Sequence, residues 1–144
     1  MTIPTWKEYF MGFAKLAATK SKDSTQVGAV LVGPDFEIRL TGYNGPPKGV
    51  LDAPARRERP TKYLYASHAE ANIIAFAARQ GIRTEGCTIY CTHHPCAACA
   101  RTLIQAGVVA VVYGSGTFQA LDAEREAVQN MAREAGIRYE AFSE

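Results

Sequence analysis

Short β-prone runs alternate with helix-length segments along this chain, and this alternation constrains the fold more than any other feature. Two β-rich runs, at residues 26–32 and 36–43, are separated by the turn residues Gly33-Pro34-Asp35, which predicts a hairpin. The rest of the chain predicts helices over residues 4–19, 67–80, 95–107 and 121–135, and strands over residues 87–92, 108–113 and 137–142.

Helices that alternate with strands after an opening hairpin predict an α/β fold of three layers. A mixed sheet of about five strands would lie between helices on both of its faces. The first helix has Thr2 or Thr5 near its start as a cap, and the second ends at Gly81, a typical stop residue. The order of the strands within the sheet does not follow from this pattern.

Residues 44–60 show no helical or strand period. They are rich in glycine and proline and carry the charged run Arg56-Arg57-Glu58-Arg59. This segment is therefore expected to form a long loop, and loops of that length are usually functional or disordered.

Length and composition limit the class of protein. With 144 residues, 47% of them hydrophobic and 21% charged, the chain suits one globular domain over residues 1–144. A net charge of +2 is too small to indicate a surface for polynucleotides. Because no apolar run reaches the roughly 18–20 residues of a membrane span and the start lacks signal-peptide features, a cytoplasmic protein without a membrane partner is expected.

All four cysteines fall in one short segment, at positions 87, 91, 96 and 99. In a cytoplasmic chain this number favours metal ligands or buried thiols over disulfides. Pro95, Cys96 and Cys99 are expected to lie in the first turn of a helix. Both sulfurs would then face one side of that helix. They would also lie in the positive field of the helix N-terminus, which favours the thiolate form. His68 supplies a third ligand, and three such ligands leave a fourth position on Zn²⁺ for water.

Glu70 lies two residues after His68, at the start of another predicted helix. Its carboxyl group suits the role of a proton carrier beside the metal. An ideal helix turns Glu70 about 200° away from His68, so both reach the metal only if His68 lies at an irregular helix start. The combination H-x-E with P-C-x-x-C is the known signature of zinc deaminases.

Several other interpretations compete with this one. A CxxC pair also occurs in redox sites and as half of a structural zinc site. A four-cysteine site using Cys87 and Cys91 is disfavoured, because residues four apart on a strand lie about 13 Å apart and cannot share one ion. A non-catalytic zinc scaffold would have no use for Glu70.

The remaining alternatives are deaminases that act on another cytosine or adenine substrate, either a nucleoside or a polynucleotide such as tRNA or single-stranded DNA. A polynucleotide deaminase would need a basic channel with aromatic stacking residues, and residues 56–65 (RRERPTKYLY) are the best match. A phosphate-reading or interface role fits that segment as well.

The chain resembles the cytidine deaminase superfamily and, more narrowly, the deoxycytidylate (dCMP) deaminase family. Besides the two zinc motifs, the resemblance covers SKDSTQVGAVLVGP at 21–34, TGYNGPPKG at 41–49, HAEANIIAFAARQG at 68–81 and ARTLIQAGVVAVVYG at 100–114. The GYNG sequence followed by proline is the feature that points to dCMP deaminases over relatives acting on tRNA, guanine or free cytidine.

The resemblance implies a cytidine deaminase-like fold and zinc-dependent hydrolysis of dCMP to dUMP and ammonia, which supplies dUMP for thymidylate synthesis. It implies that Asn44 contacts the sugar or its phosphate and that the Ala69 N–H contacts the pyrimidine carbonyl. Candidates for the 5′-phosphate are Lys22, Ser24 and Lys48, for which a solvated surface position is the alternative.

The resemblance also implies a homo-oligomer, commonly a hexamer, with dCTP and dTTP as effectors and no polynucleotide partner. Arg79 matches a position near subunit contacts and the nucleotide, and Tyr43 and Gly45 lie in the motif close to the effector site. The chain departs from the family after residue 114, where Phe118 replaces the base-stacking aromatic from a shifted position or belongs to the core. This difference leaves open whether 5-substituted dCMP is accepted.

Overall fold

The computed structural model describes residues 2–116 and 121–143, which form a five-stranded sheet with the order β2-β1-β3-β4-β5. Its strands are β1 (Gly28–Val32), β2 (Ile38–Tyr43), β3 (Thr88–His93), β4 (Ala110–Gly116) and β5 (Arg138–Ala141). Its helices are α1 (Trp6–Ala18), the 3₁₀ helix η1 (Pro54–Arg57), α2 (Lys62–Tyr65), α3 (Ala69–Gln80), α4 (Ala97–Gln105) and α5 (Asp122–Glu134). No helix in the described parts of the chain combines the length and apolar character needed to cross a membrane.

The sheet is mixed, as predicted. Strand β1 pairs antiparallel with β2 and with β3, whereas β3, β4 and β5 run parallel. The predicted hairpin is therefore confirmed, and α4 and α5 form the crossovers that parallel neighbours require.

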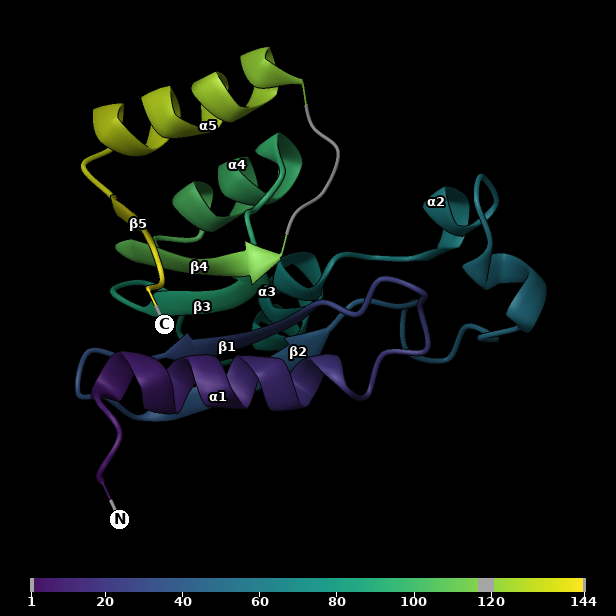
Figure 1. The fold of residues 1–144 in the computed structure, drawn as a ribbon, viewed down its shortest axis with the longest axis horizontal. Helices are drawn as coiled ribbons and strands as arrows, with labels where there is room; N and C mark the ends of the chain where they lie inside the picture. Colours follow the sequence, from purple (N-terminus) through teal and green to yellow (C-terminus); the bar gives the residue numbers. More distant parts are fainter. Residues whose placement is uncertain (1, 117–120, 144) are drawn as a thin grey trace.

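Helices cover both faces of the sheet and give the expected three layers (Figure 1). One face of the sheet packs on α1. There, Phe10, Met11 and Ala14 of the helix form an apolar cluster with Val30 of β1 and Val112 of β4. The other face packs on α3 and α4 in a second cluster that includes Leu31, Ile73, Ile89, Leu103 and Val111. Strand β1 lies between these clusters, and all five of its residues are buried.

The ends of several elements differ from the sequence-based expectation. Helix α1 begins after Thr5, which forms a reciprocal capping box with Glu8. Helix α4 begins one residue after Cys96, so Pro95 precedes the cap and does not lie in the first turn as predicted. The segment expected as a featureless loop contains η1, and the short helix α2 follows it. Both are too short to produce a periodic pattern in the sequence.

One edge of the sheet collects the elements that matter for function. Because β2 and β3 point the same way, their carboxyl ends meet there, next to the start of β1. Helices α3 and α4 begin beside this edge, while η1 and α2 project from it (Figure 1). Binding sites commonly form where strand ends and helix starts meet in this way.

Gly28, the first residue of β1, lies directly against α1. A Cβ there would overlap the Ala14 carbonyl oxygen and lie 2.9 Å from the Ala18 Cα, and neither backbone atom can rotate away. Gly28→Ala is expected to lower the free energy of unfolding by about 1–3 kcal/mol, the usual range for overpacking. Chemical denaturation followed by circular dichroism measures this change.

Gly12 provides the matched control within α1. A Cβ at Gly12 meets no atom within 4 Å. Gly12→Ala should therefore raise the free energy of unfolding by roughly 0.5–1 kcal/mol through helix propensity. Equal effects of the two substitutions would contradict the close packing of α1 on β1.

Candidate zinc-dependent active site

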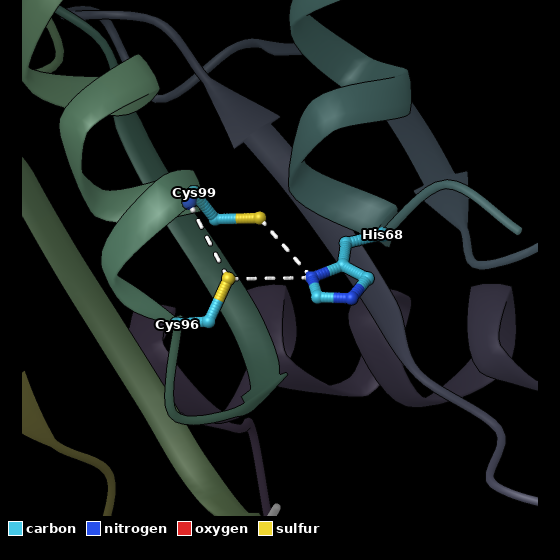
Figure 2. Close-up of side chains that lie close together, drawn as sticks. All are labelled: His68, Cys96 and Cys99. Atoms are coloured by element: carbon cyan, nitrogen blue, oxygen red, sulfur yellow. Dashed lines mark hydrogen bonds between the residues drawn. The ribbon is translucent and has the colours of Figure 1, made fainter. Parts of the chain in front are cut away.

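Three side chains with metal-binding atoms meet where α3 and α4 begin. His68 immediately precedes α3 and Cys96 immediately precedes α4, both with extended backbone, while Cys99 lies in the first turn of α4. The Nδ1 atom of His68 lies 3.4 Å from the Sγ of Cys96 and 3.4 Å from the Sγ of Cys99 (Figure 2). The three potential ligand atoms all lie within 4.8 Å of one another.

A two-residue bridge keeps His68 outside the helix. Ser67 and Gly45 exchange both backbone hydrogen bonds, at 3.0 and 2.8 Å, which holds the chain extended up to His68. The helix then begins with the bond from the Asn72 N–H to the His68 carbonyl, at 3.0 Å. This is the irregular start that a shared role for His68 and Glu70 requires.

The cluster is polarised toward a thiolate at Cys96. Hydrogen bonds from the Cys99 thiol and from His68 lower the pKa of Cys96 to about 4. The same contact with Cys96 raises the pKa of Cys99, and the hydrogen bond to Cys96 raises the pKa of His68. One ligand is thus ready to bind a cation, and metal binding must release the protons of the others.

Glu70 is buried in the first turn of α3, with 4% of its surface exposed. Burial raises the pKa of its carboxyl group, and the thiol of Cys91 hydrogen-bonds to it. Glu70 does not belong to the cluster of ligand atoms, but it lines the same cavity as His68 and Cys96. A carboxyl group with a raised pKa in this position is suited to taking up and releasing protons.

The donor set of this cluster fits zinc. Two cysteine sulfurs and one imidazole nitrogen are typical zinc ligands, and three protein ligands leave a fourth position, as catalytic zinc sites require. Two thiolates also balance the charge of Zn²⁺. The residues that would hold the ion are therefore His68, Cys96 and Cys99.

The other two cysteines lie elsewhere. Cys87 is buried just before β3 and contacts the Arg39 guanidinium at 3.5 Å, and Cys91 is buried within β3. Within residues 2–116 and 121–143, the grouping of potential metal ligands contains neither of them. The geometry thus offers no four-cysteine site.

A cavity of about 670 Å³ opens beside the cluster, and both Asn44 and Ala69 line it. Asn44 is nearly buried, and its side chain holds the segment before β1. Its Oδ1 accepts the Val27 N–H at 2.9 Å, and its Nδ2 donates to the Thr25 carbonyl at 2.8 Å. One amide hydrogen of Asn44 is left for a ligand.

Of the remaining residues singled out from the sequence, those that the structure describes lie outside the cavity lining. Lys22, Ser24 and Lys48 are exposed, and the Lys48 ammonium lies over the Phe76 ring, 5.8 Å from its centroid. Tyr43 is exposed, and its backbone carbonyl accepts a hydrogen bond from the Asn72 side-chain amide. Arg79 lies near the end of α3. Phe118 falls outside the described residues.

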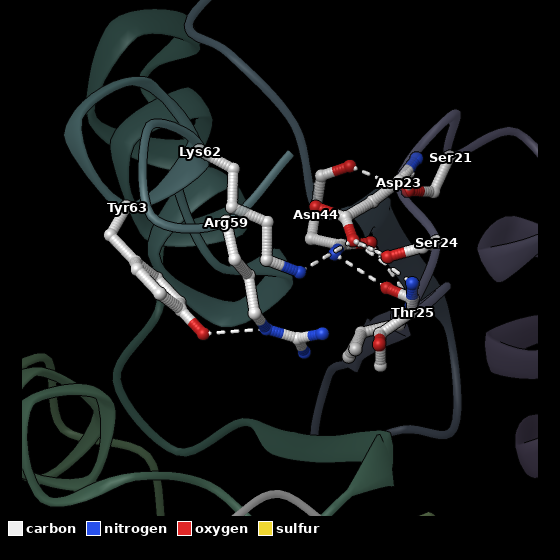
Figure 3. A network of polar contacts seen from close by, with 9 residues as sticks. Ser21, Asp23, Ser24, Thr25, Asn44, Arg59, Lys62 and Tyr63 are labelled. Atoms are coloured by element: carbon white, nitrogen blue, oxygen red, sulfur yellow. Dashed lines mark hydrogen bonds and ion pairs between the residues drawn. The ribbon is translucent and has the colours of Figure 1, made fainter. Parts of the chain in front are cut away.

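Two cations of the cavity were not singled out from the sequence, although both lie in the 56–65 segment. The Nε atom of Arg59 donates to the Tyr63 hydroxyl at 2.7 Å, and the Lys62 ammonium pairs with the Asp23 carboxylate at 2.9 Å (Figure 3). The pair is almost fully enclosed, with 8% and 6% of the two side chains exposed. Burial opposes ionisation of Asp23, but the hydrogen bonds from Lys62 and the Thr25 N–H together lower its pKa. The basic and aromatic composition of residues 56–65 was the one signal in the sequence that could have pointed to Arg59 and Lys62.

Comparisons with known proteins agree with this site. Residues 4–115 match the family described as "Cytidine and deoxycytidylate deaminase zinc-binding region". The deoxycytidylate deaminase of Mus musculus is 38% identical over 145 residues, covering 96% of this chain and 80% of that protein. The Homo sapiens enzyme is also 38% identical, over 95% of this chain and 79% of that protein.

A solved structure extends the agreement to the fold. The dCMP deaminase of cyanophage S-TIM5, in complex with dCMP and dUMP, superposes with a TM-score of 0.77. It is 26% identical and covers 99% of this chain and 100% of its own. Fold and site together define a zinc-dependent deaminase of the cytidine deaminase superfamily. The chain belongs to the dCMP deaminase family.

The cysteine assignment leads to a direct test. Cys96→Ser and Cys99→Ser should lose zinc, because a hydroxyl is a far poorer zinc ligand than a thiolate. Cys87→Ser, the control, should retain one zinc per chain. Elemental analysis of the purified variants measures this, and loss of zinc from the Cys87 variant would show that the ligands were wrongly assigned.

Proposed function

We propose that this chain catalyses the hydrolytic deamination of dCMP to dUMP and ammonia. The observation that carries the proposal is the position of Glu70, buried beside the His68, Cys96 and Cys99 cluster in a cavity that also presents cations. The cluster and Glu70 suit the chemistry, and the cations suit a substrate with a phosphate. The relatives that bear the name deoxycytidylate deaminase support the choice of substrate.

Zinc held by the three ligands supplies Lewis acidity, which makes a water molecule acidic near neutral pH. Glu70 takes a proton from the water and delivers it to N3 of the cytosine as the water oxygen bonds to C4. The same carboxylate then carries the remaining hydroxyl proton to the amino group, and the C4–N bond breaks to release ammonia. Because burial raises the pKa of Glu70, its carboxyl can hold a proton between these steps.

Two neighbouring groups orient the base and sugar in this proposal. Ala69 is the first residue of α3, so its N–H lies in the positive end of the helix and suits the pyrimidine carbonyl oxygen. The remaining amide hydrogen of Asn44 suits a sugar or phosphate oxygen. Since Asn44 also holds Thr25 and Val27, it shapes the cavity wall as well.

Replacement of Glu70 separates proton transfer from metal binding. Glu70→Gln should retain zinc but lower kcat by at least about 10²–10⁴, the usual contribution of a positioned acid–base group. Ammonia release from dCMP and the zinc content of the same preparation measure both parts. Near-normal kcat in this variant would refute the proposed mechanism.

Arg59 is the side chain best placed to bind the 5′-phosphate. Its Nε is held by Tyr63, and the rest of its guanidinium extends toward the segment that carries Thr25 (Figure 3). Arg59 makes no ion pair with any described residue, and a planar guanidinium with free donors suits a phosphate. Lys62 adds a second cation, an ammonium, although Asp23 already balances its charge.

The alternative sites for the phosphate are the exposed Lys22, Ser24 and Lys48. They would need to move to reach the cavity, whereas Arg59 lines it already. The predicted role of Lys22 and Lys48 is therefore tested against that of Arg59 in the same experiment.

Deoxycytidine should be a poor substrate, because it lacks the remote phosphate whose binding energy orients the reacting base. Arg59→Gln should lower kcat/KM for dCMP by about 10–100-fold, the value of a hydrogen bond between charged groups, and leave kcat/KM for deoxycytidine nearly unchanged. Lys22→Gln and Lys48→Gln are the matched controls and should behave like the wild type. A larger loss of kcat/KM for dCMP in either lysine variant than in Arg59→Gln would show that a surface lysine binds the phosphate.

The proposal extends to assembly and regulation, as in the family that the chain resembles. Apolar side chains are exposed on the segment that projects from the sheet, among them Leu51 and Leu64, at 69% and 83%. Their burial between subunits would favour a homo-oligomer, for which a hexamer is expected. Light scattering measures the oligomeric state, and assays with added dCTP and dTTP test activation and inhibition. A stable monomer would contradict this part of the proposal.

A further inference from the structure

Glu124 reaches from one helix to the metal-binding end of another. It lies in the first turn of α5, and its Oε1 accepts the Ala97 backbone N–H at 3.0 Å. Ala97 directly follows the ligand Cys96, and Glu124 and Cys96 line the same cavity. The contact joins positions 27 residues apart, so it belongs to the packing of α5 on α4 and not to local helix capping.

The contact acts on the peptide that carries Cys96. The Ala97 N–H and the Cys96 carbonyl belong to one planar peptide group, so fixing the first orients the second. The carbonyl in turn accepts the Ala100 N–H at 2.8 Å, and the Cys96 sulfur accepts the Cys99 N–H at 3.4 Å. Glu124 therefore completes a set of hydrogen bonds that fixes the direction of the Cys96 side chain.

We propose that Glu124 is a positioning residue for the zinc site, which holds the Cys96–Ala97 peptide in the orientation that metal binding requires. Hydrogen bonds one step behind a metal ligand set the direction of that ligand, and their loss commonly lowers metal affinity 10- to 100-fold. The inference concerns zinc binding and is independent of which nucleotide is the substrate.

Two conservative variants separate the reach of Glu124 from its charge. Glu124→Gln keeps an oxygen at the same distance without the charge, whereas Glu124→Asp keeps the charge but withdraws the oxygen by one methylene. If orientation is the role, zinc affinity should fall about 10–100-fold in Glu124→Asp and stay near that of the wild type in Glu124→Gln. Glu126→Asp, on an exposed residue of the same helix, is the matched control.

Chelator competition measures zinc affinity, and the visible spectrum of the cobalt-substituted protein reports ligand geometry. A changed cobalt spectrum in Glu124→Asp, restored in Glu124→Gln, is the expected signature. Wild-type affinity in Glu124→Asp would overturn the inference, as would a loss confined to Glu124→Gln. Unfolding of the zinc-free variants provides the remaining check, since lower stability with unchanged zinc affinity would leave Glu124 as an ordinary helix contact.

Discussion

The approach of His68 Nδ1 to the sulfurs of Cys96 and Cys99 joins the starts of α3 and α4, and the remaining parts of the site are arranged around it. The amino-terminal ends of helices carry partial positive charge, which by itself disfavours a metal cation. The same field favours cysteine thiolates, and the low pKa of Cys96 reflects its hydrogen bonds within this cluster. The negative sulfur of Cys96 thus makes a helix-terminal position suitable for zinc.

A second buried arrangement of charge shapes the opposite part of the cavity. The Lys62–Asp23 pair and the Asn44 side chain connect three segments that lie far apart in the sequence. Loss of one partner from a buried ion pair costs about 3–5 kcal/mol, because the other charge is left uncompensated. This wall of the cavity is consequently held by polar contacts in addition to the apolar cluster to which Ala69 and Val27 belong.

Chemistry and recognition occupy different elements of this fold. The proposed proton carrier, Glu70, and the candidate metal ligands His68, Cys96 and Cys99 lie at or directly before the starts of α3 and α4. The cations that suit a nucleotide phosphate come from the segment with η1 and α2, which projects from that edge (Figure 1). Recognition by a projecting segment on a rigid scaffold allows the substrate to vary while the reaction stays the same.

The sequence by itself determined the alternation of helices and strands and the hairpin, and it singled out His68, Glu70, Cys96 and Cys99 as the candidate site that the fold brings together. These features follow from periodicity and from short motifs, because residues that are close in the sequence are also close in space. Even there, the position of His68 outside the helix needed the bridge between Gly45 and Ser67, which local spacing does not encode.

Only the tertiary structure decided the order of the strands, the enclosure of Lys62, the place of Arg59 in the cavity, and the contact of Glu124 with Ala97. Each depends on residues distant in sequence that meet only after the sheet has formed. The family resemblance singled out Lys22 and Lys48, but these two residues have the same charge as Arg59 and Lys62, and charge alone does not show which pair lines the cavity. The packed fold separates them, because it turns one pair of cations toward the cavity and leaves the other in solvent.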